Sequence, residues 1–372
     1  MTERGSLTPT TPTSQLFRPV RLGALDLPNR LVMAPLTRLR ADHDGVPTDL
    51  MVEHYRQRAG LGLIVTEGTW PVQEGRTWIE QPGIETDAHV RGWRRVTDAV
   101  HAEGGRIAMQ IMHGGRVSHP ELTGTGRIVA PSAVASPRLI RVGDGKVLPP
   151  APHALDGDEI QLVIAQFVAA AERAIDAGMD AVEVHGANGY LVHQFFSPGA
   201  NQRTDEYGGT PEDRARFAVE VTRAVAAAVG AERTGIRLSP DTSESGLEDT
   251  LAAYGAFADA VAPLGLAFVD VLHEDPAGEL VQAIRRRSGA PLIANSGFGT
   301  PTTRDEAAHL VAGGLAEAVG VGRPAIANPD LDVRWRHGLP ENEADPETFY
   351  TGGPLGYTDY PTADDPAARA SA

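Results

Sequence analysis

The feature that most constrains the fold is the alternation of short apolar segments with helical patterns along most of the chain. Eight segments have the length and composition of buried strands, and each is followed by a stretch of helical periodicity. The predicted strands are 31–34, 63–66, 106–112, 181–184, 235–239, 267–272, 291–294 and 316–321. Eight strands in strict alternation with helices predict an α/β fold, the (β/α)8 TIM barrel.

One barrel accounts for the whole chain of 372 residues, which is within the range of this fold with insertions. We expect the barrel over residues 15–361, flanked by disordered tails at 1–14 and 362–372. An open doubly wound sheet is the alternative architecture. The absence of a G-x-G-x-x-G motif after an early strand counts against it.

Two further segments extend the predicted barrel. Residues 17–28 alternate around Gly23, which predicts an N-terminal hairpin that closes one end of the fold. Residues 113–155, after the third strand, are rich in Gly, Pro, Ser and Thr and show no helical period. Long irregular segments in compact domains are usually functional, so we expect an extended rim insertion here, with a hairpin over 138–147.

The charge limits the classes of partner. The formal net charge is -16, which argues against nucleic acid, because nucleic acid phosphates require a basic surface. It argues equally against an anionic membrane surface, and no apolar run approaches the ~20 residues of a membrane span. We therefore expect a small-molecule substrate, and a monomer or a homodimer.

The absence of cysteine removes disulfides, thiolate metal sites and cysteine nucleophiles together. No histidine pair has a metal-binding spacing such as H-E-x-x-H, so we predict no catalytic metal. The polar N-terminus lacks the hydrophobic core of a signal peptide. These features fit a cytoplasmic protein.

Three polar residues follow the fourth predicted strand, namely His185, Asn188 and Tyr190. In a parallel α/β fold, ligands bind at the carboxyl ends of the strands. His185 and Asn188 can both donate to one oxygen atom, and a phenol with a pKa of ~10 suits proton donation at neutral pH. A structural histidine and a core tyrosine are the alternatives, and the grouping of all three residues favours a ligand site.

Two glycine loops predict a phosphate site. Gly297, Phe298 and Gly299 follow the seventh strand, and Gly322 with Arg323 follows the eighth. Loops at these two positions form the recurrent phosphate site of such barrels, and an arginine there makes a charge-assisted contact. A simple turn is the alternative for the glycines.

Two long polar side chains lie on predicted strands. Arg237 is on the fifth strand and Gln110 is just short of the end of the third. A buried arginine without a partner is costly, so Arg237 either contacts a ligand or forms a structural salt bridge. The same choice between ligand and structure is open for Gln110.

Seven motifs, in order over about residues 17–361, resemble the Old Yellow Enzyme family of flavin-dependent ene-reductases. The motifs are NRLVMAPLTR from Asn29, YRQRAGLGLIVTEGT from Tyr55, QIMHGGRVSH from Gln110, VEVHGANGYLVHQFFSPGANQRTDEYGG from Val182, GIRLSP from Gly235, VGRPAIANPDL from Val321 and FYTGGPLGYTDYP from Phe349. The His185/Asn188 pair, rather than two histidines, and Thr37, rather than cysteine, resemble the classical subgroup.

The resemblance implies a barrel that holds non-covalent FMN, reduced by NADPH or NADH. It places Pro35 and Thr37 against the flavin, and Gly68 and Gln110 at its pyrimidine edge. Arg237 would lie near N1 and O2, where a cation stabilises the negative charge of the reduced ring. The phosphate would lie on Gly297, Phe298, Gly299, Gly322 and Arg323.

The same resemblance implies the catalytic roles. His185 and Asn188 would hold the carbonyl or nitro oxygen of an electron-poor alkene above the flavin, and Tyr190 would protonate its α-carbon. Tyr350 would line the mouth. Met112 stands where many relatives have tryptophan, and its slimmer, flexible side chain predicts a more tolerant substrate pocket.

Three other functions are compatible with parts of this pattern. A nitroester or nitroarene reductase would use the same site and depend less on Tyr190. A non-catalytic flavin-binding barrel is a hypothesis from another class, against which the intact trio argues. A lyase or isomerase for a phosphorylated sugar would need only the barrel and the phosphate loops.

Overall fold

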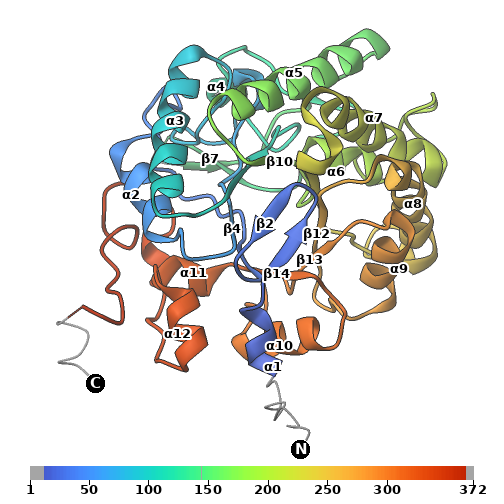
Figure 1. Ribbon diagram of the computed structural model, residues 1–372. Coiled ribbons are helices and arrows are strands. Elements are labelled where there is room, and N and C mark those ends of the chain that lie inside the picture. Colours follow the sequence, from blue (N-terminus) through green and yellow to red (C-terminus); the bar gives the residue numbers. More distant parts are fainter. Residues whose placement is uncertain (1–11, 144, 366–372) are drawn as a thin grey trace, which may run out of the picture.

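The computed structural model describes residues 12–143 and 145–365 (Figure 1). In this part of the chain, eight parallel strands close into a barrel in the order β10-β11-β12-β13-β14-β3-β4-β5. They are β3 (Leu31–Met33), β4 (Leu63–Val65), β5 (Ile107–Ile111), β10 (Ala181–Gly186), β11 (Thr234–Leu238), β12 (Phe268–Leu272), β13 (Leu292–Asn295) and β14 (Ala318–Val321). The predicted barrel is confirmed, and the open doubly wound sheet is excluded.

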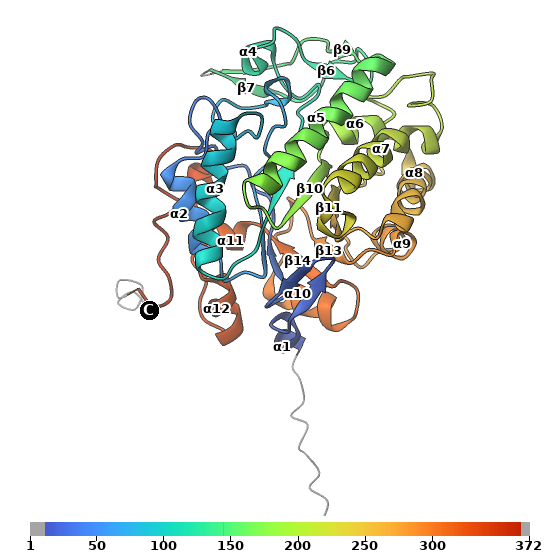
Figure 2. The same cartoon turned by 45° about the horizontal axis from the view of Figure 1, so that its top comes forward.

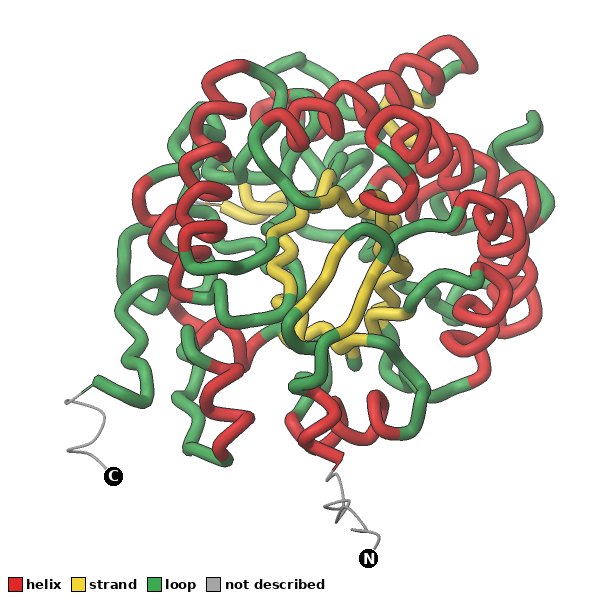
Figure 3. The backbone as a smooth tube through the Cα atoms, viewed as in Figure 1, coloured by secondary structure: helices red, strands yellow, loops and turns green. Residues whose placement is uncertain are grey.

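Helices surround the strands on all sides (Figure 3). Those that follow barrel strands are α2 (Asp49–Gln57), α3 (Asp87–Ala102), α5 (Gly157–Asp176), α7 (Pro211–Val229), α8 (Gly246–Val261), α9 (Glu279–Ser288), α10 (Arg304–Ala312), α11 (Arg323–Ala327) and α12 (Leu331–His337). Short 3-10 turns are η1 (Gln73–Gly75), η2 (Ala231–Arg233), η3 (Ala262–Leu264) and η4 (Pro346–Thr348). The helix starts follow local chemistry, as where Asp156 and Glu159 form the capping box of α5. None of the described helices is long and apolar enough to cross a membrane.

The N-terminal hairpin covers the amino-terminal end of the barrel, as predicted (Figure 1). Its strands are β1 (Val20–Leu22) and β2 (Leu25–Leu27), paired antiparallel. The tight turn depends on Gly23, which has a left-handed backbone with φ 58°. A Cβ atom on this residue would lie 2.3 Å from the Glu232 carbonyl oxygen, so only glycine fits. The leucines of both strands are buried against the strand starts, which closes this end of the barrel.

The chain enters the fold earlier than predicted. Helix α1 (Pro12–Leu16) overlaps the expected tail 1–14, and α1 contacts α10. Leu16 is fully buried, and this apolar anchor explains the order of the preceding turn. The remaining residues of the predicted N-terminal tail, and residues 366–372 of the C-terminal one, lie outside the described residues. Within the described part of that second tail, Ala363 N–H donates to Asp330 Oδ2 at 2.6 Å.

The predicted rim insertion lies over the opposite end of the barrel from α1 (Figure 2). It contains α4 (Pro120–Thr123), the parallel pair β6 (Val129–Ala130) and β9 (His153–Ala154), and the antiparallel pair β7 (Ile140–Val142) and β8 (Gly145–Val147). The β7–β8 pair confirms the hairpin expected over 138–147. The insertion therefore contains several short strands, most of which its Gly- and Pro-rich sequence did not predict.

The strand register separates the barrel interior into layers. Ala108, Ala181 and Phe268 pack on the hairpin leucines and form an apolar floor. Side chains two residues further along a strand point the same way, so Gln110, Glu183 and Asp270 form the next layer. This second layer is polar, and it carries the site described below.

Candidate active site

The carboxyl end of β10 positions the three polar residues that the sequence singles out. Asn188 adopts a left-handed backbone with φ 60°, which asparagine tolerates better than most residues. Its N–H donates to Ser239 Oγ at 2.7 Å, from the loop after β11. Tyr190 then begins α6 (Leu191–Phe196) as its N-cap. The turn therefore places His185 on the strand and Tyr190 at a helix start, close to one another.

His185 is a neutral, buried hydrogen-bonding group. Its ring lies 5.3 Å from the ring of Tyr190, measured between centroids. Burial, together with the charge of Arg237, holds the pKa of the His185 imidazole well below its usual value. Within the described residues, its Nδ1 atom has no hydrogen-bond partner. A buried polar atom without a partner indicates a ligand position.

Tyr190 is held in its protonated form. Burial raises the pKa of its hydroxyl to about 12, although the nearby Arg138 opposes the shift. The guanidinium carbon of Arg138 lies 6.0 Å from the centroid of the tyrosine ring, and Trp78 packs against the same ring edge-on at 6.2 Å. Sequence reasoning missed both neighbours, because they come from the loop after β4 and from the rim insertion.

A polar layer lies beneath this turn, inside the barrel. Gln110 Nε2 donates to Glu183 Oε1 at 2.8 Å, and Arg237 forms a buried ion pair with Asp270. Both carboxyl groups are fully buried, and burial followed by the charge of Asp270 raises the pKa of Glu183 to about 8. Arg237 thus forms a structural salt bridge, one of the two alternatives that the sequence left open. Its Nε atom has no hydrogen-bond partner among the described residues.

The sequence contained a signal for these two carboxyl groups. Glu183 and Asp270 each interrupt an otherwise apolar strand, in the runs AVEVH and FVDVL. An acidic residue in a buried strand is rare without a partner. The partners could not be read from the chain, because Arg237 and Asp270 are adjacent only through the register of β11 and β12.

The loops at the carboxyl ends of β3 and β4 form one side of the candidate site. Pro35 and Thr37 are half-buried in the loop after β3, and that loop is held by Glu67 Oε2, which accepts the Arg38 and Leu39 N–H groups at 3.1 and 3.2 Å. Gly68 packs against Met112, since a Cβ at this position would lie 2.7 Å from the Met112 sulfur. The two predicted residues Gly68 and Met112 are therefore neighbours.

The two glycine loops that the sequence predicts as a phosphate site lie next to each other. Arg323 donates to the Phe298 carbonyl at 2.8 Å, which joins the loop after β14 to the loop after β13. Gly297 has φ 102°, and an added Cβ at Gly299 would meet no atom within 4 Å, so backbone is open to a ligand there. Phe298 is exposed. The structure thus places one arginine and two glycines together at the mouth of the barrel.

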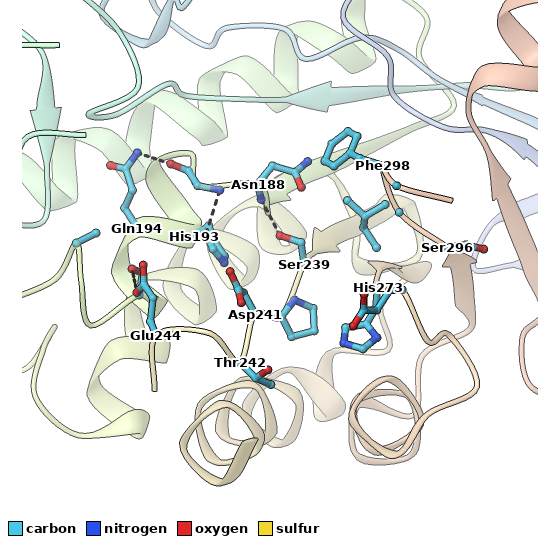
Figure 4. Close-up of a pocket in the computed structure, with 18 of the residues that line it drawn as sticks. Asn188, His193, Gln194, Ser239, Asp241, Thr242, Glu244, His273, Ser296 and Phe298 are labelled. Atoms are coloured by element: carbon cyan, nitrogen blue, oxygen red, sulfur yellow. Dashed lines mark hydrogen bonds between the residues drawn. The ribbon is translucent and has the colours of Figure 1, made fainter. Parts of the chain in front are cut away.

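A cavity of ≈ 610 Å³ opens between the loops that follow β10, β11, β12 and β13. Figure 4 shows the Asn188 amide and the Phe298 ring facing each other across it, with Ser239 beneath Asn188. Asn188, Gly297, Phe298 and Gly299 line this cavity, whereas the other predicted site residues are not part of its wall. Tyr350, expected at the mouth, is exposed.

These residues fit an FMN molecule. A flavin needs a cation beside its pyrimidine ring, hydrogen-bonding groups around it and an open loop for its phosphate. The inward-facing Arg237 supplies the cation, and its free Nε and the free Nδ1 of His185 are buried polar atoms that require a partner. Gly297 and Gly299 supply backbone that no side chain covers, and a Cβ at Gly322 would meet only Leu36 Cδ2, at 3.7 Å.

Comparison with known proteins identifies the family of this chain. The model of the NADH:flavin oxidoreductase / NADH oxidase family matches residues 15–342. The "Probable flavin mononucleotide-dependent alkene reductase" of Leishmania infantum is 46% identical over 358 residues, which cover 93% of this chain and 97% of that protein.

Solved structures show the same similarity. The Old Yellow Enzyme homologue from Zymomonas mobilis has a TM-score of 0.88 at 40% identity, with 93% of this chain and 99% of that chain covered. Morphinone reductase in complex with tetrahydroNAD has a TM-score of 0.87 at 44% identity, with 94% and 98% covered. With its barrel, its polar layer and these matches, the chain belongs to the NADH:flavin oxidoreductase / NADH oxidase family, the Old Yellow Enzyme family, which confirms the resemblance seen in the sequence.

Proposed function

We propose that this protein is an FMN-dependent ene-reductase, which passes hydride from NADPH or NADH to the activated C=C bond of α,β-unsaturated carbonyl or nitro compounds. The observation that carries the proposal is the pairing of a neutral His185 with a protonated Tyr190 at the carboxyl end of β10. The relatives support it, because one is named as an alkene reductase and one was solved with a nicotinamide analogue.

Bound FMN supplies the hydride carrier between the nicotinamide and the alkene. Arg237 and the peptide groups near Gly68 would face the ring, and Pro35, Thr37 and Gln110 would complete its surroundings. Gly297, Phe298, Gly299, Gly322 and Arg323 would hold the phosphate. The ion pair with Asp270 fixes the Arg237 guanidinium, so its charge needs no rearrangement during the reaction.

His185 and Asn188 would donate hydrogen bonds to the oxygen of the substrate. This oxygen gains negative charge as hydride reaches the β-carbon, so the two donors bind the transition state more strongly than the ground state. A neutral imidazole still has one N–H group that can donate this hydrogen bond. The left-handed turn at Asn188 fixes the second donor.

Tyr190 would deliver a proton to the α-carbon. Its pKa of about 12 keeps the phenol protonated at neutral pH, and its burial excludes water from the transfer. The proton leaves Tyr190 Oη as the C–H bond forms, and solvent returns it afterwards. Met112 packs in the same cluster as Tyr190, so it would shape the substrate side of the pocket.

The visible spectrum of the purified protein tests the proposal. We expect a yellow protein whose flavin absorbance bleaches anaerobically with NADPH and returns when an enone is added. A protein that neither carries nor takes up FMN would contradict the proposal. A bound flavin that neither NADPH nor NADH bleaches would support the non-catalytic flavin-binding barrel instead.

The nitroester or nitroarene reductase is the second candidate on the same site. It requires hydride but no proton on carbon, so it depends less on Tyr190. We also expect a cytoplasmic monomer or homodimer. Sedimentation at micromolar concentration and fractionation of cells test these two expectations.

A further inference from the structure

The polar layer inside the barrel holds two carboxyl groups for one cation. Glu183 comes from β10 and Asp270 from β12, with Arg237 on the strand between them. Both acidic residues are fully buried, and Arg237 is 3% exposed. Two negative charges beside one positive charge, all three buried, leave an uncompensated buried charge.

The hydrogen bonds of this layer leave one oxygen of each carboxyl group without a donor. Glu183 Oε1 accepts from Gln110, and Asp270 Oδ2 pairs with Arg237. Among the described residues, no donor reaches the second oxygen of either group, Glu183 Oε2 or Asp270 Oδ1. The two carboxyl groups are nevertheless within hydrogen-bonding contact of each other. Two ionised carboxylates have only acceptors, so one proton between them is required to satisfy both oxygens.

The other groups that face the pair do not supply this charge. Gln110 from β5 is an uncharged amide. His185 follows Glu183 by two residues on β10, and its imidazole is held neutral. Arg237 from β11 is the one cation that acts on either carboxyl group in this layer of the described chain. One proton on the pair makes the sum of the charges zero, which is the state that burial favours.

We propose that Glu183 Oε2 and Asp270 Oδ1 share one proton, and that the pair is a positioning group that fixes Arg237 and keeps the layer beneath the flavin uncharged. The step is a simple O–H···O hydrogen bond in which Glu183 donates and Asp270 accepts. The part that concerns flavin rests on the proposed function, whereas the shared proton is a property of the protein alone.

Glu183→Gln is the informative variant. A glutamine can accept from Gln110 through its oxygen and donate to Asp270 Oδ1 through its nitrogen, so it reproduces the protonated carboxyl at every pH. Glu317→Gln is the matched control at the other end of the barrel. Both Glu317 oxygens already accept from donors, Arg285 and the Leu292 N–H, so an amide nitrogen there would face a donor.

Infrared spectroscopy of the FMN-free protein tests the shared proton directly. We expect a protonated carboxyl band at pH 7 that shifts in D2O, titrates away near pH 8 and is missing from Glu183→Gln. If the variant does not fold, the titration of the carboxyl band in the wild-type protein still tests the shared proton. The absence of a carboxyl band that titrates in this range would overturn the proposal, as would an unchanged band in Glu183→Gln.

Thermal unfolding gives a second readout. The pKa of Glu183 is raised to about 8 in the folded protein, so the folded state binds more protons than the unfolded state between about pH 4.5 and pH 8. Stability from this group is therefore lost as the pH rises. We expect the melting temperature of Glu183→Gln, relative to wild type, to rise between pH 5 and pH 9, while Glu317→Gln melts lower throughout. If Glu183→Gln lowered the melting temperature as much as Glu317→Gln at every pH, Glu183 would be an ordinary ionised carboxylate in the wild type.

The midpoint potential of bound FMN tests the effect on the cofactor. Above pH 8 the wild-type layer carries a negative charge that opposes reduction, whereas the glutamine layer stays neutral. We expect equal potentials at pH 7 and a higher potential for Glu183→Gln than for wild type at pH 9. Equal potentials at both pH values would overturn the flavin part of the proposal. A failure to take up FMN would contradict the proposed function and leave the infrared and melting tests valid.

Discussion

Tyr190 and His185 show how burial gives different roles to two neighbouring side chains. The two rings are 5.3 Å apart, yet burial lowers the pKa of one and raises that of the other to about 12. The imidazole is left as a hydrogen-bond donor without charge, and the phenol as a protonated acid. Neither state depends on pH near neutrality, so the chemistry should be robust to it.

Replacement of Tyr190 by phenylalanine tests the assignment of the acid. We expect alkene turnover to fall by ~10²–10⁴-fold, because a positioned proton donor contributes about that much, while flavin reduction by NADPH is unchanged. Stopped-flow measurement of the two half-reactions separates these effects. In wild type, the rate of the alkene half-reaction should not change between pH 6 and pH 7, below the range in which Glu183 titrates. An equal fall in both half-reactions would remove Tyr190 from the proton transfer.

The two loops that follow β13 and β14 act as one unit, because Arg323 joins them through the Phe298 carbonyl. We expect Arg323→Gln to weaken FMN binding by about 10- to 100-fold, the equivalent of one charged hydrogen bond of ~1.5–3 kcal/mol. Fluorescence titration of the FMN-free protein measures this affinity. Arg304→Gln is the control, since Arg304 only pairs with Asp305 at 3.7 Å on the surface. Equal affinities in the two variants would contradict the phosphate assignment.

The segment 346–360, which contains the FYTGG motif, is held by arginines of the loop after β3. Arg38 is 1% exposed, and it donates to the Phe349 and Gly356 carbonyls at 3.1 and 2.7 Å. We expect Arg38→Ala to cost ~3 kcal/mol, because buried carbonyls lose their donor, and to speed amide hydrogen exchange over residues 346–360. Exchange within β10 is the internal reference, and Arg91→Ala on the exposed face of α3 is the control. Unchanged exchange in the segment would show that other contacts hold it.

The pH dependence of stability reflects the whole barrel. His54, His113 and His185 are buried, and burial lowers the pKa of each, that of His113 to about 3. A histidine with a lowered pKa stabilises the fold above pH 6.5 and loses that contribution as the pH falls. We expect the melting temperature to drop from pH 7 to pH 5, since each neutral histidine contributes up to ~1.4 kcal/mol per pH unit.

His113→Asn should make this slope shallower. The Gly115 N–H donates to His113 Nδ1 at 3.1 Å, and an asparagine oxygen can accept the same bond without a titratable group. His43→Gln is the control, because it also removes a histidine but at a side chain that is 83% exposed. Parallel curves for wild type and both variants would show that buried histidines do not set the acid limit.

The sequence predicted the barrel because apolar strands and amphipathic helices are local patterns. It also predicted that the loops after β13 and β14 would lie together, since parallel strands end at the same side. It did not predict the helix at Pro12–Leu16, which depends on burial of Leu16 against α10. The contact of Arg138 with Tyr190 and the pairing of Glu183 with Asp270 were equally hidden, because they depend on the rim fold and on the register around β11.

The leucine-lined hairpin of β1 and β2 has a kinetic consequence. It shuts the amino-terminal end of the barrel, so the reductant and the alkene have to arrive through the same rim-side entrance. We expect the two compounds to occupy the space above His185 and Tyr190 in turn, so that the first departs before the second binds. Steady-state velocities should accordingly give parallel lines in double-reciprocal plots, and an excess of either compound should delay turnover of the other.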